Sequence, residues 1–184
     1  MRSVKELMNK LQMKLKGIEI RRCTDRCVDA LMLFADNIAH HVPGRDYFMR
    51  QYESQLEDRR DIWIAWYEDQ IVGYCIYNRK PLYAFFLKLG IPEIQDIIIH
   101  PEMRRQGIAR ELIALCEAQA KEEGAEHIGI GVGLDASYGR AQRLYVGLGY
   151  VPDGNGVTYE RRTVNKGDLR RIDDDLSLMM VKTL

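Results

Sequence analysis

The sequence predicts an α/β protein built around one sheet, and three observations lead to this prediction. The chain has 184 residues, a length that suits one domain with one hydrophobic core. Its hydrophobic content of 46% and its mixed charges are those of an ordinary folded protein. Apolar residues alternate in some segments and recur with helical spacing in others, in the order β-α-α-β-β-β-α-β-α-β-β.

Composition also excludes several classes of partner. Lys and Arg together number 27, as do Asp and Glu, so no overall field favours nucleic acid or an anionic membrane. No apolar run approaches the roughly 20 residues that cross a bilayer, and the charged N-terminus lacks the apolar centre of a secretion signal. The four cysteines have no C-x-x-C spacing and no nearby histidine, which predicts no metal site. We therefore expect a cytoplasmic protein with reduced thiols and without metal, nucleic-acid or membrane partners.

Residues 1–16 are expected to form an amphipathic helical arm ahead of a domain that spans residues 17–184. The apolar side chains of the arm share one helical face and are Val4, Leu7, Met8, Leu11 and Leu15. A helix on a membrane surface is one interpretation. The favoured interpretation is an arm that packs on the domain or on a second subunit, which makes this helix the candidate surface for a homodimer.

The domain is expected to begin with a strand and two helices. The strand covers residues 17–23, and Thr24 can cap the helix that follows. The buried face of that helix would carry Cys27, Leu31, Phe34 and Ile38. A second helix is expected at 45–59, after a break at 40–44.

The remaining elements alternate between strands and helices. A hairpin at 61–67 and 70–77 turns at Glu68 and Asp69, and the apolar centre of residues 79–92 predicts a short helix or a lid. Further strands are expected at 93–100, 127–133, about 156–164 and 176–183, and further helices at 105–123 and 137–148. Gly124 can end the first of these two helices.

The turn between residues 100 and 110 has the chemistry of an anion site. Pro101 stops the preceding strand, while Gly107 and Ala109 keep the first helical turn free of bulk. The first amide N–H groups of a helix lack internal partners and carry a partial positive charge. Arginines reinforce this potential at positions 104, 105 and 110. The pattern therefore predicts a site for a diphosphate at the helix start.

Two motifs in this region resemble those of the GNAT family of N-acetyltransferases. The family signature [Q/R]-x-x-G-x-[G/A] is matched by residues 104–109, after a strand that matches its L-x-V-x-P pattern at 97–101. Further along, A-x-x-L-Y-x-x-L-G-[F/Y] is matched by residues 141–150. The resemblance covers residues 17–184. It implies a mixed central sheet of about seven strands, splayed open around acetyl-CoA as cosubstrate, with helices on both faces.

The resemblance also implies which residues hold the coenzyme. The amides of Arg105 to Ala109 would bind the pyrophosphate, and the backbone of Ile97 to Ile99 would pair with the pantetheine arm. The full set of expected coenzyme contacts is Ile97, Ile98, Ile99, Arg104, Arg105, Gln106, Gly107, Ile108, Ala109, Arg110, Tyr138 and Tyr145. Many relatives have an asparagine where this chain has Tyr138, so this chain departs from the family at one coenzyme contact.

Tyr145 lies where the family often carries its general acid, and its ordinary pKa of about 10 keeps a phenol protonated at neutral pH. It would also fit the apolar face of its helix. Glu93 is the candidate general base, with a solvated carboxylate at the strand end and an ordered water chain as alternatives. Glu93 and Gln95 are expected on one strand face, with Asp96 and His100 on the other, and His100 is expected to cap the turn. Gly129, Gly131 and Gly133 alternate on one face of their strand, which would leave room for substrate or for a close backbone contact.

The acceptor is less constrained. In the family it contacts the two helices after the first strand, the loop before the cofactor strand, and the final hairpin. Those regions here offer His40, His41, Asp46, Tyr47, Tyr83, Phe85, Phe86, Tyr159 and Glu160, which suit a small primary amine such as an amino acid, polyamine or aminoglycoside. A protein acetyltransferase for a lysine or N-terminal amine, and a non-catalytic acyl-CoA sensor, are the alternatives.

Overall fold

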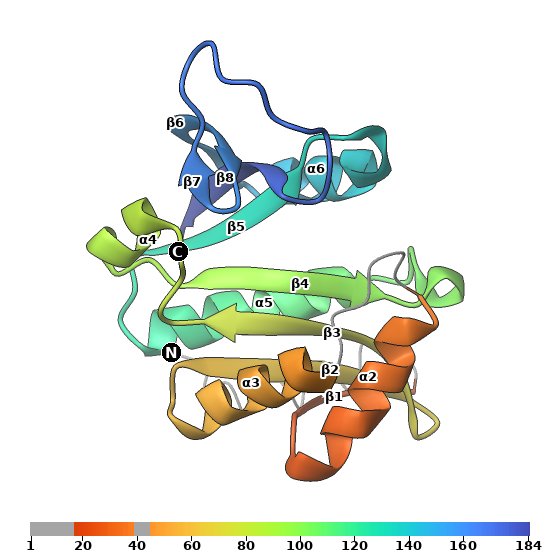
Figure 1. Cartoon of the computed structure of the whole chain (residues 1–184). Helices are drawn as coiled ribbons and strands as arrows, with labels where there is room; N and C mark the ends of the chain where they lie inside the picture. Colours follow the sequence, from red (N-terminus) through yellow and green to blue (C-terminus); the bar gives the residue numbers. More distant parts are fainter. Residues whose placement is uncertain (1–16, 39–44) are drawn as a thin grey trace.

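The computed structural model describes residues 17–38 and 45–184, so the expected arm at 1–16 and the two histidines His40 and His41 lie outside the described residues. The described residues form one sheet of eight strands in the order β1-β2-β3-β4-β5-β8-β6-β7 (Figure 1). The strands are β1 (Ile18–Arg22), β2 (Arg60–Tyr67), β3 (Gln70–Asn78), β4 (Glu93–Ile99), β5 (His127–Gly133), β6 (Val151–Tyr159), β7 (Arg162–Thr163) and β8 (Leu176–Thr183).

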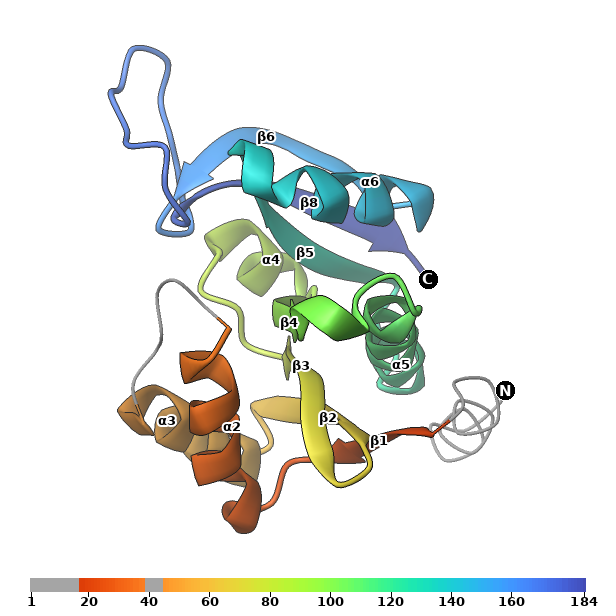
Figure 2. The same cartoon turned by 90° about the vertical axis from the view of Figure 1, so that its right-hand side faces the viewer.

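Helices cover both faces of strands β1 to β4, which are antiparallel neighbours (Figure 2). On one face lie α2 (Val28–Asp36) and α3 (Arg45–Leu56), whose Leu31 and Phe48 share a buried cluster with Ile64. On the other lies α5 (Ile108–Glu122), whose Leu112 shares a second cluster with Cys75 of β3. The predicted α/β class, with helices on both faces, is confirmed.

Strands β4 and β5 are parallel, but only the first two residues of β4 pair with β5. Glu93 is opposite Gly129 and Ile94 is opposite Ile130, and beyond them the two strands diverge (Figure 1). On its other edge β4 pairs with β3, and the register shifts where Asp96 adopts a φ of 50°. This β-bulge breaks the regular alternation of side chains. The sheet is therefore splayed open on the β5 side of β4, as the resemblance implied.

Helix α5 begins at Ile108, three residues later than the sequence pattern predicts. The delay has a local cause, since Arg105 and Gly107 have φ angles of 65° and 92° and no helix can run through them. The 3-10 turn η2 (Pro101–Met103) fills the preceding segment, and His100 caps it by accepting from the amide of Glu102 at 3.4 Å. The far end is as predicted, because Gly124, with a φ of 85°, follows the helix.

Other boundaries also differ from the prediction. The first helix starts with the 3-10 turn η1 (Asp25–Cys27), and the Thr24 side chain makes no cap hydrogen bond. Helix α3 ends at Leu56 instead of residue 59, since Asp58 has a φ of 54°. The hairpin turn at Glu68 and Asp69 is confirmed.

The C-terminal half differs most in its last strands. The strand expected at 156–164 is the end of β6, a two-residue turn at Glu160 and Arg161, and the short β7. Both turn residues have positive φ, which suits a tight hairpin. Of the two alternatives for residues 79–92, the short helix is observed as α4 (Ala84–Leu89). The 3-10 turn η3 (Ala136–Tyr138) precedes α6 (Gly139–Gly147) where one longer helix was expected.

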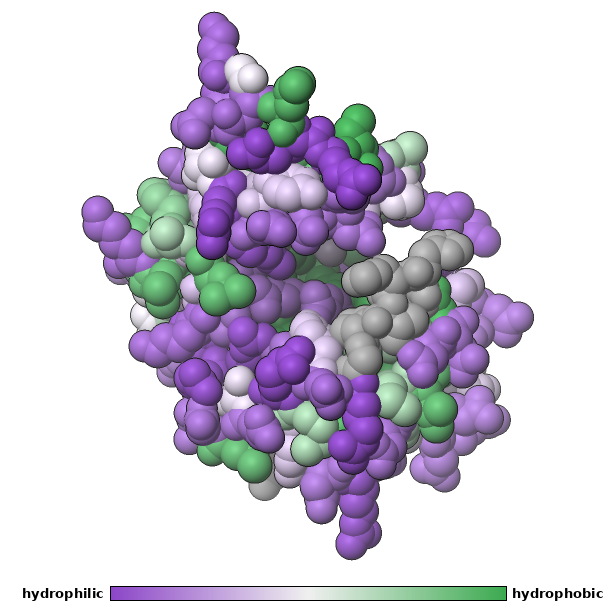
Figure 3. Space-filling view, in the orientation of Figure 1, coloured by the Kyte–Doolittle hydropathy of each residue, from purple (hydrophilic) through white to green (hydrophobic). Residues whose placement is uncertain are grey.

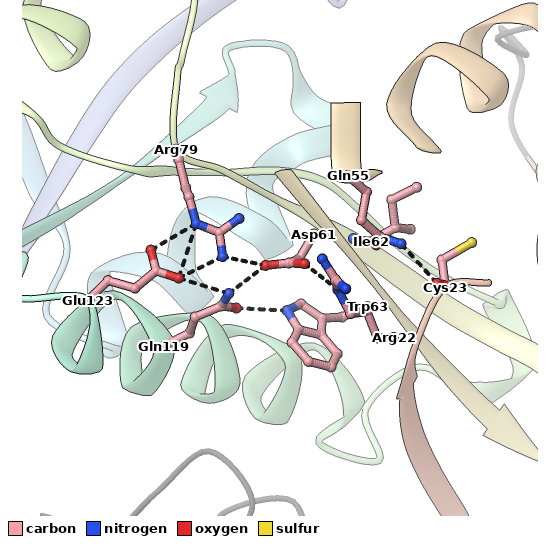
Figure 4. Close-up of polar contacts among 9 residues, drawn as sticks. All are labelled: Arg22, Cys23, Gln55, Asp61, Ile62, Trp63, Arg79, Gln119 and Glu123. Atoms are coloured by element: carbon pink, nitrogen blue, oxygen red, sulfur yellow. Dashed lines mark hydrogen bonds and ion pairs between the residues drawn. The ribbon is translucent and has the colours of Figure 1, made fainter. Parts of the chain in front are cut away.

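A group of polar residues around the buried Asp61 joins β1, β2, β3 and the C-terminal end of α5 (Figure 4). The Asp61 carboxylate is 2% exposed and accepts from Arg22 Nε at 2.5 Å, Arg79 Nη2 at 2.6 Å and Gln119 Nε2 at 2.5 Å. Arg79 Nη2 also donates to Glu123 at 2.6 Å. We call this group, completed by Trp63 and Tyr77, the Asp61 cluster.

Candidate active site

A cavity of about 990 Å³ lies in the opening between β4 and β5. Its wall is built by β4, by the segment that leads into α5, by β5, and by the residues around η3, the β6–β7 turn and the start of β8. Figure 3 shows the surface hollowed between the two halves of the sheet. Every predicted coenzyme contact except Gln106 lines this cavity. The Gln106 side chain instead turns back to the carbonyl of Glu102 at 3.4 Å.

The start of α5 presents unbonded amides to the cavity. The first hydrogen bond of the helix runs from the amide of Glu111 to the carbonyl of Gly107 at 3.1 Å. The amides from Arg105 to Arg110 make no backbone hydrogen bond within the described part of the chain. Such a row of N–H groups, with the positive end of the helix dipole, favours an anion. The left-handed backbone conformations of Arg105 and Gly107 set the direction of these N–H groups.

Charged and apolar groups surround that row of amides. Arg105, Arg110 and Arg140 line the cavity with exposed side chains. Arg104 also lines it, but its Nε donates to the carbonyl of Ile99 at 3.1 Å, which ties the turn to the end of β4. The free edge of β4 from Ile97 to Ile99 follows directly.

Tyr145 of α6 faces the same cavity. Its side chain is 7% exposed and packs against Tyr150 with ring centroids 6.2 Å apart. Its hydroxyl makes no hydrogen bond with any described residue. Burial, and to a lesser extent the nearby Cys75 thiol, raises the pKa of Tyr145 above its ordinary value. The phenol is therefore a protonated, unpartnered donor in the cavity wall.

Glu93 does not line the cavity. It is fully buried, so the expectation of a solvated strand-end carboxylate is wrong. Its carboxylate forms an ion pair with Arg161 of the β6–β7 turn and accepts from Gln95 Nε2 at 3.0 Å. Burial raises the pKa of Glu93, and the Arg161 guanidinium opposes that rise. The pair connects β4 to the β6–β7 turn.

The glycines of β5 make room for side chains from three other segments. A Cβ at Gly129 would lie 2.1 Å from the ring of Phe86, and one at Gly133 would lie 2.4 Å from the ring of Tyr138. A Cβ at Gly131 would lie 3.1 Å from Arg161 Nη1. The predicted free space is thus filled by α4, η3 and the β6–β7 turn. These glycines allow the cavity wall to close.

The predicted acceptor residues separate into two groups. Glu160 lines the cavity, and Tyr47 reaches it indirectly by donating to the carboxylate of Asp96, which does line it. The hydroxyls of Tyr83 and Tyr159 are bonded to Asp153 and Asp173, at 2.7 and 2.9 Å. Neither of these two tyrosines lines the cavity, nor do Asp46, Phe85 and Phe86.

Sequence reasoning missed several residues of the site. Asp96 was expected on the strand face opposite Glu93 and Gln95, but the bulge turns it toward Tyr47 on α3, which covers the sheet. Arg161, Asp174 and Asp175 were not predicted, although all three line the cavity. They lie in the β6–β7 turn and in the segment before β8, where no local pattern indicates a ligand.

Two features are absent from the described residues, 17–38 and 45–184. No three His, Cys, Asp or Glu side chains among them gather closely enough to hold a metal ion. In the same residues, no helix has both the length and the apolar character to span a bilayer.

Known proteins resemble the chain in sequence. A family model described as the acetyltransferase (GNAT) family matches residues 26–150. An uncharacterised N-acetyltransferase of Chlorobaculum tepidum is 30% identical over 79 residues, which make up 43% of this chain and 46% of that protein. The match thus spans slightly less than half the length of this curated relative.

Solved structures resemble the chain in fold. The Salmonella typhimurium protein yncA, solved with its cofactor acetyl-CoA, has a TM-score of 0.66 and 15% identity over 91% of this chain and 94% of its own. The ribosomal-protein-S18-alanine N-acetyltransferase of Escherichia coli has a TM-score of 0.65 and 14% identity over 90% of this chain and 93% of its own. With the family model matching more than half of its residues, the chain belongs to the GNAT family of acetyltransferases.

Proposed function

We propose that the protein is an acetyl-CoA-dependent N-acetyltransferase that acts on the primary amine of a small molecule. The observation that supports this most directly is one cavity that combines a row of unbonded amides with the unpartnered phenol of Tyr145. The amides suit the pyrophosphate of the coenzyme, and the phenol suits its thioester end.

The coenzyme would follow the predicted path along the cavity. The amides of Arg105 to Ala109 would bind the pyrophosphate, with Arg110 beside them. The free edge of β4 from Ile97 to Ile99 would pair with the pantetheine arm as an added strand, since β5 has diverged there. Tyr138 lines the cavity with its hydroxyl bonded to Asp174 at 2.8 Å, so its ring is the part available to the coenzyme.

Acetyl transfer would then move one proton in each direction. The nitrogen of the neutral amine attacks the thioester carbonyl carbon, the C–N bond forms and the C–S bond breaks. Tyr145 gives its proton to the departing sulfur, and the proton that the nitrogen loses returns to the phenol through water. The pKa of Tyr145 is raised, while that of a thiol is about 8.5, so full transfer is uphill and occurs late in C–S cleavage.

A water chain is the better candidate for the base. Glu93 does not line the cavity and is paired with Arg161, so its carboxylate would have to leave a buried ion pair to reach the amine. Breaking such a pair costs several kcal/mol, typically about 3 to 5. We therefore assign Glu93 to holding the β6–β7 turn, and water to the proton.

A protein N-terminal amine is the second candidate acceptor. Among proteins with this fold, those of Escherichia coli and Brucella melitensis are ribosomal-protein-alanine N-acetyltransferases. A peptide would be acetylated in preference to any small amine if this candidate were correct.

The test combines a substrate panel with two matched variants. Small amines and peptides are incubated with acetyl-CoA, and the released thiol is measured. Tyr145→Phe should lower kcat by about 100-fold or more, because general acid catalysis contributes on the order of 10² to 10⁴. Tyr77→Phe removes another buried phenol, one bonded to Glu123 in the Asp61 cluster, and should leave kcat within about twofold.

The outcomes separate the hypotheses. Acetyl-CoA binding without thiol release for every acceptor would favour the sensor alternative over an enzyme. Unchanged turnover in Tyr145→Phe would remove the phenol as the acid while leaving the transferase activity in place.

A further inference from the structure

Apart from Arg161 of the β6–β7 turn, which pairs with the buried Glu93, the charged residues that line the cavity come from different elements according to sign. The arginines 104, 105, 110 and 140 belong to the segment before α5 and to the first turns of α5 and α6. The carboxylates come from the β4 bulge (Asp96), the β6–β7 turn (Glu160) and the segment before β8 (Asp174 and Asp175). A coenzyme and acceptor that together present a negatively charged end and a positively charged end would match this separation of charges.

None of these four carboxylates forms an ion pair within the described residues. Asp96 and Asp174 accept from the neutral hydroxyls of Tyr47 and Tyr138. Arg161, the cation adjacent to Glu160 in sequence, is directed to the buried Glu93. Within the described residues, no ion pair therefore neutralises the negative charge of these four carboxylates.

Glu160 and Asp175 are held next to each other. The amide of Glu160 donates to the carbonyl of Asp175 at 3.2 Å, where the β6–β8 ladder ends at Tyr159 and Leu176. Both residues are exposed and both line the cavity. Two carboxylates that line one cavity and belong to residues joined by a backbone hydrogen bond suit one ammonium group better than a neutral or anionic group.

The Tyr145 hydroxyl is a second, independent feature of the same cavity that indicates a ligand. The Tyr145 side chain is more than nine-tenths buried, its hydroxyl has no partner among the described residues, and it lines the cavity wall. Under the proposed function this phenol marks the thioester, so the reacting amine must come close to it. Glu160 and Asp175 lie on other elements of the wall, which leaves them for a different part of the acceptor.

We propose that the acceptor is a diamine or polyamine, with one amine acetylated and a second, charged ammonium bound by Glu160 and Asp175. This proposal rests on the proposed function and narrows its substrate class. A neutral alkylamine would lack the second contact, and an amino acid would bring its carboxylate toward uncompensated negative charge. Because Glu160 and Asp175 are exposed, they affect substrate binding, and therefore KM, rather than the rate of the chemical step.

The test uses three acceptors with the same four-carbon chain. Butylamine, 1,4-diaminobutane and 4-aminobutanoate differ only in a neutral, positive or negative second end. Thiol release should give 1,4-diaminobutane a kcat/KM about tenfold above butylamine, with 4-aminobutanoate lowest, as two partly exposed ion pairs would produce. The preference should shrink as salt rises from about 0.01 to 0.5 M, since the Debye length falls severalfold.

A double variant locates the preference. Glu160→Gln with Asp175→Asn should bring the ratio of the kcat/KM values for diamine and monoamine close to one. Asp168→Asn is the control, because Asp168 lies in the same segment, does not line the cavity and pairs with Arg170 at 3.1 Å. That variant should retain the full ratio.

Three results would overturn the proposal. Equal kcat/KM for butylamine and 1,4-diaminobutane would overturn it while leaving the transferase activity intact. An undiminished ratio in the double variant would place the selectivity elsewhere. Absence of thiol release with all three amines, or release only with peptides, would overturn the proposal together with the small-amine function.

Discussion

The polar groups at the two ends of helix α5 differ in how many hydrogen-bond partners they have. At the C-terminal end, the buried Asp61 carboxylate has three donors, and two of them, Arg79 and Gln119, also donate to Glu123 (Figure 4). At the N-terminal end, a helix length of about 22 Å away, the amides from Arg105 to Arg110 have no backbone partner among the described residues. The same helix thus connects a buried carboxylate that has three donors with a row of amides that has no backbone partner within the described part of the chain.

The difference separates groups that stabilise the fold from groups kept available for a ligand. A buried carboxylate without partners destabilises a protein, so the Asp61 cluster needs every partner it has. The amides before α5 are open to the cavity and water, so leaving them unbonded costs little. Tyr77 and Tyr145 repeat the contrast, because the first phenol donates to Glu123 and the second has no partner among the described residues.

The largest expected effect comes from comparing two variants, each of which places a glutamate at one end of α5. Gly107→Glu should abolish acetyl-CoA binding, since the carboxylate would occupy and repel the pyrophosphate position. Gly124→Glu imposes a similar strain, as its φ of 85° is close to the 92° of Gly107, and a Cβ there would meet nothing within 4 Å. Titration calorimetry with acetyl-CoA should show binding only for the second variant.

Loss of binding in both variants would indicate that strain, and not the anion site, accounts for the effect. Retained binding in Gly107→Glu would show that the pyrophosphate lies elsewhere in the cavity.

The Asp61 cluster is expected to show a smaller effect that concerns stability alone. Asp61→Asn removes the charge between Arg22 and Arg79, and the free energy of unfolding should fall by about 2–3 kcal/mol. This loss of free energy is smaller than that for breaking a fully buried ion pair, because the Arg22 side chain is 47% exposed and Arg79 retains its ion pair with Glu123. Denaturant unfolding measures the change.

The control for this variant is the same substitution in an exposed pair. Asp29 pairs with Arg45 at 2.8 Å with both side chains more than half exposed, so Asp29→Asn should cost less than about 1 kcal/mol. Equal losses in the two variants, or a loss of acetyl-CoA affinity in folded Asp61→Asn, would contradict the division between the two ends of α5.

The sequence predicted the parts of the site that depend on neighbouring residues. The start of α5 was identified because Pro101, Gly107 and the arginines act within one turn, and the structure places them on the cavity or beside it. The hairpin at Glu68 and the end of α5 at Gly124 are similarly local.

The sequence could not predict the parts that depend on distant partners. Glu93 is buried because Arg161, 68 residues away, pairs with it. The glycines of β5 indicated a close approach, but their neighbours Phe86, Arg161 and Tyr138 belong to three separate segments. The start of β6 was missed for a local reason, since Gly154 and Gly156 adopt positive φ and make a strand resemble a loop.

The smallest expected effect is the absence of a descending limb in the pH profile of the reaction. The phenol of Tyr145 donates only when protonated, so activity should fall as the pH rises through its pKa. Burial raises that pKa above its ordinary value of about 10, which moves the fall upward. The kcat/KM for a small amine should therefore rise with pH as the amine loses its proton, and show no descending limb below about pH 10. A descending limb below about pH 9 that disappears in Tyr145→Phe would mean that a positively charged neighbour lowers the pKa of this phenol in the working complex, the opposite of the effect that burial and the Glu123 carboxylate have on Tyr77.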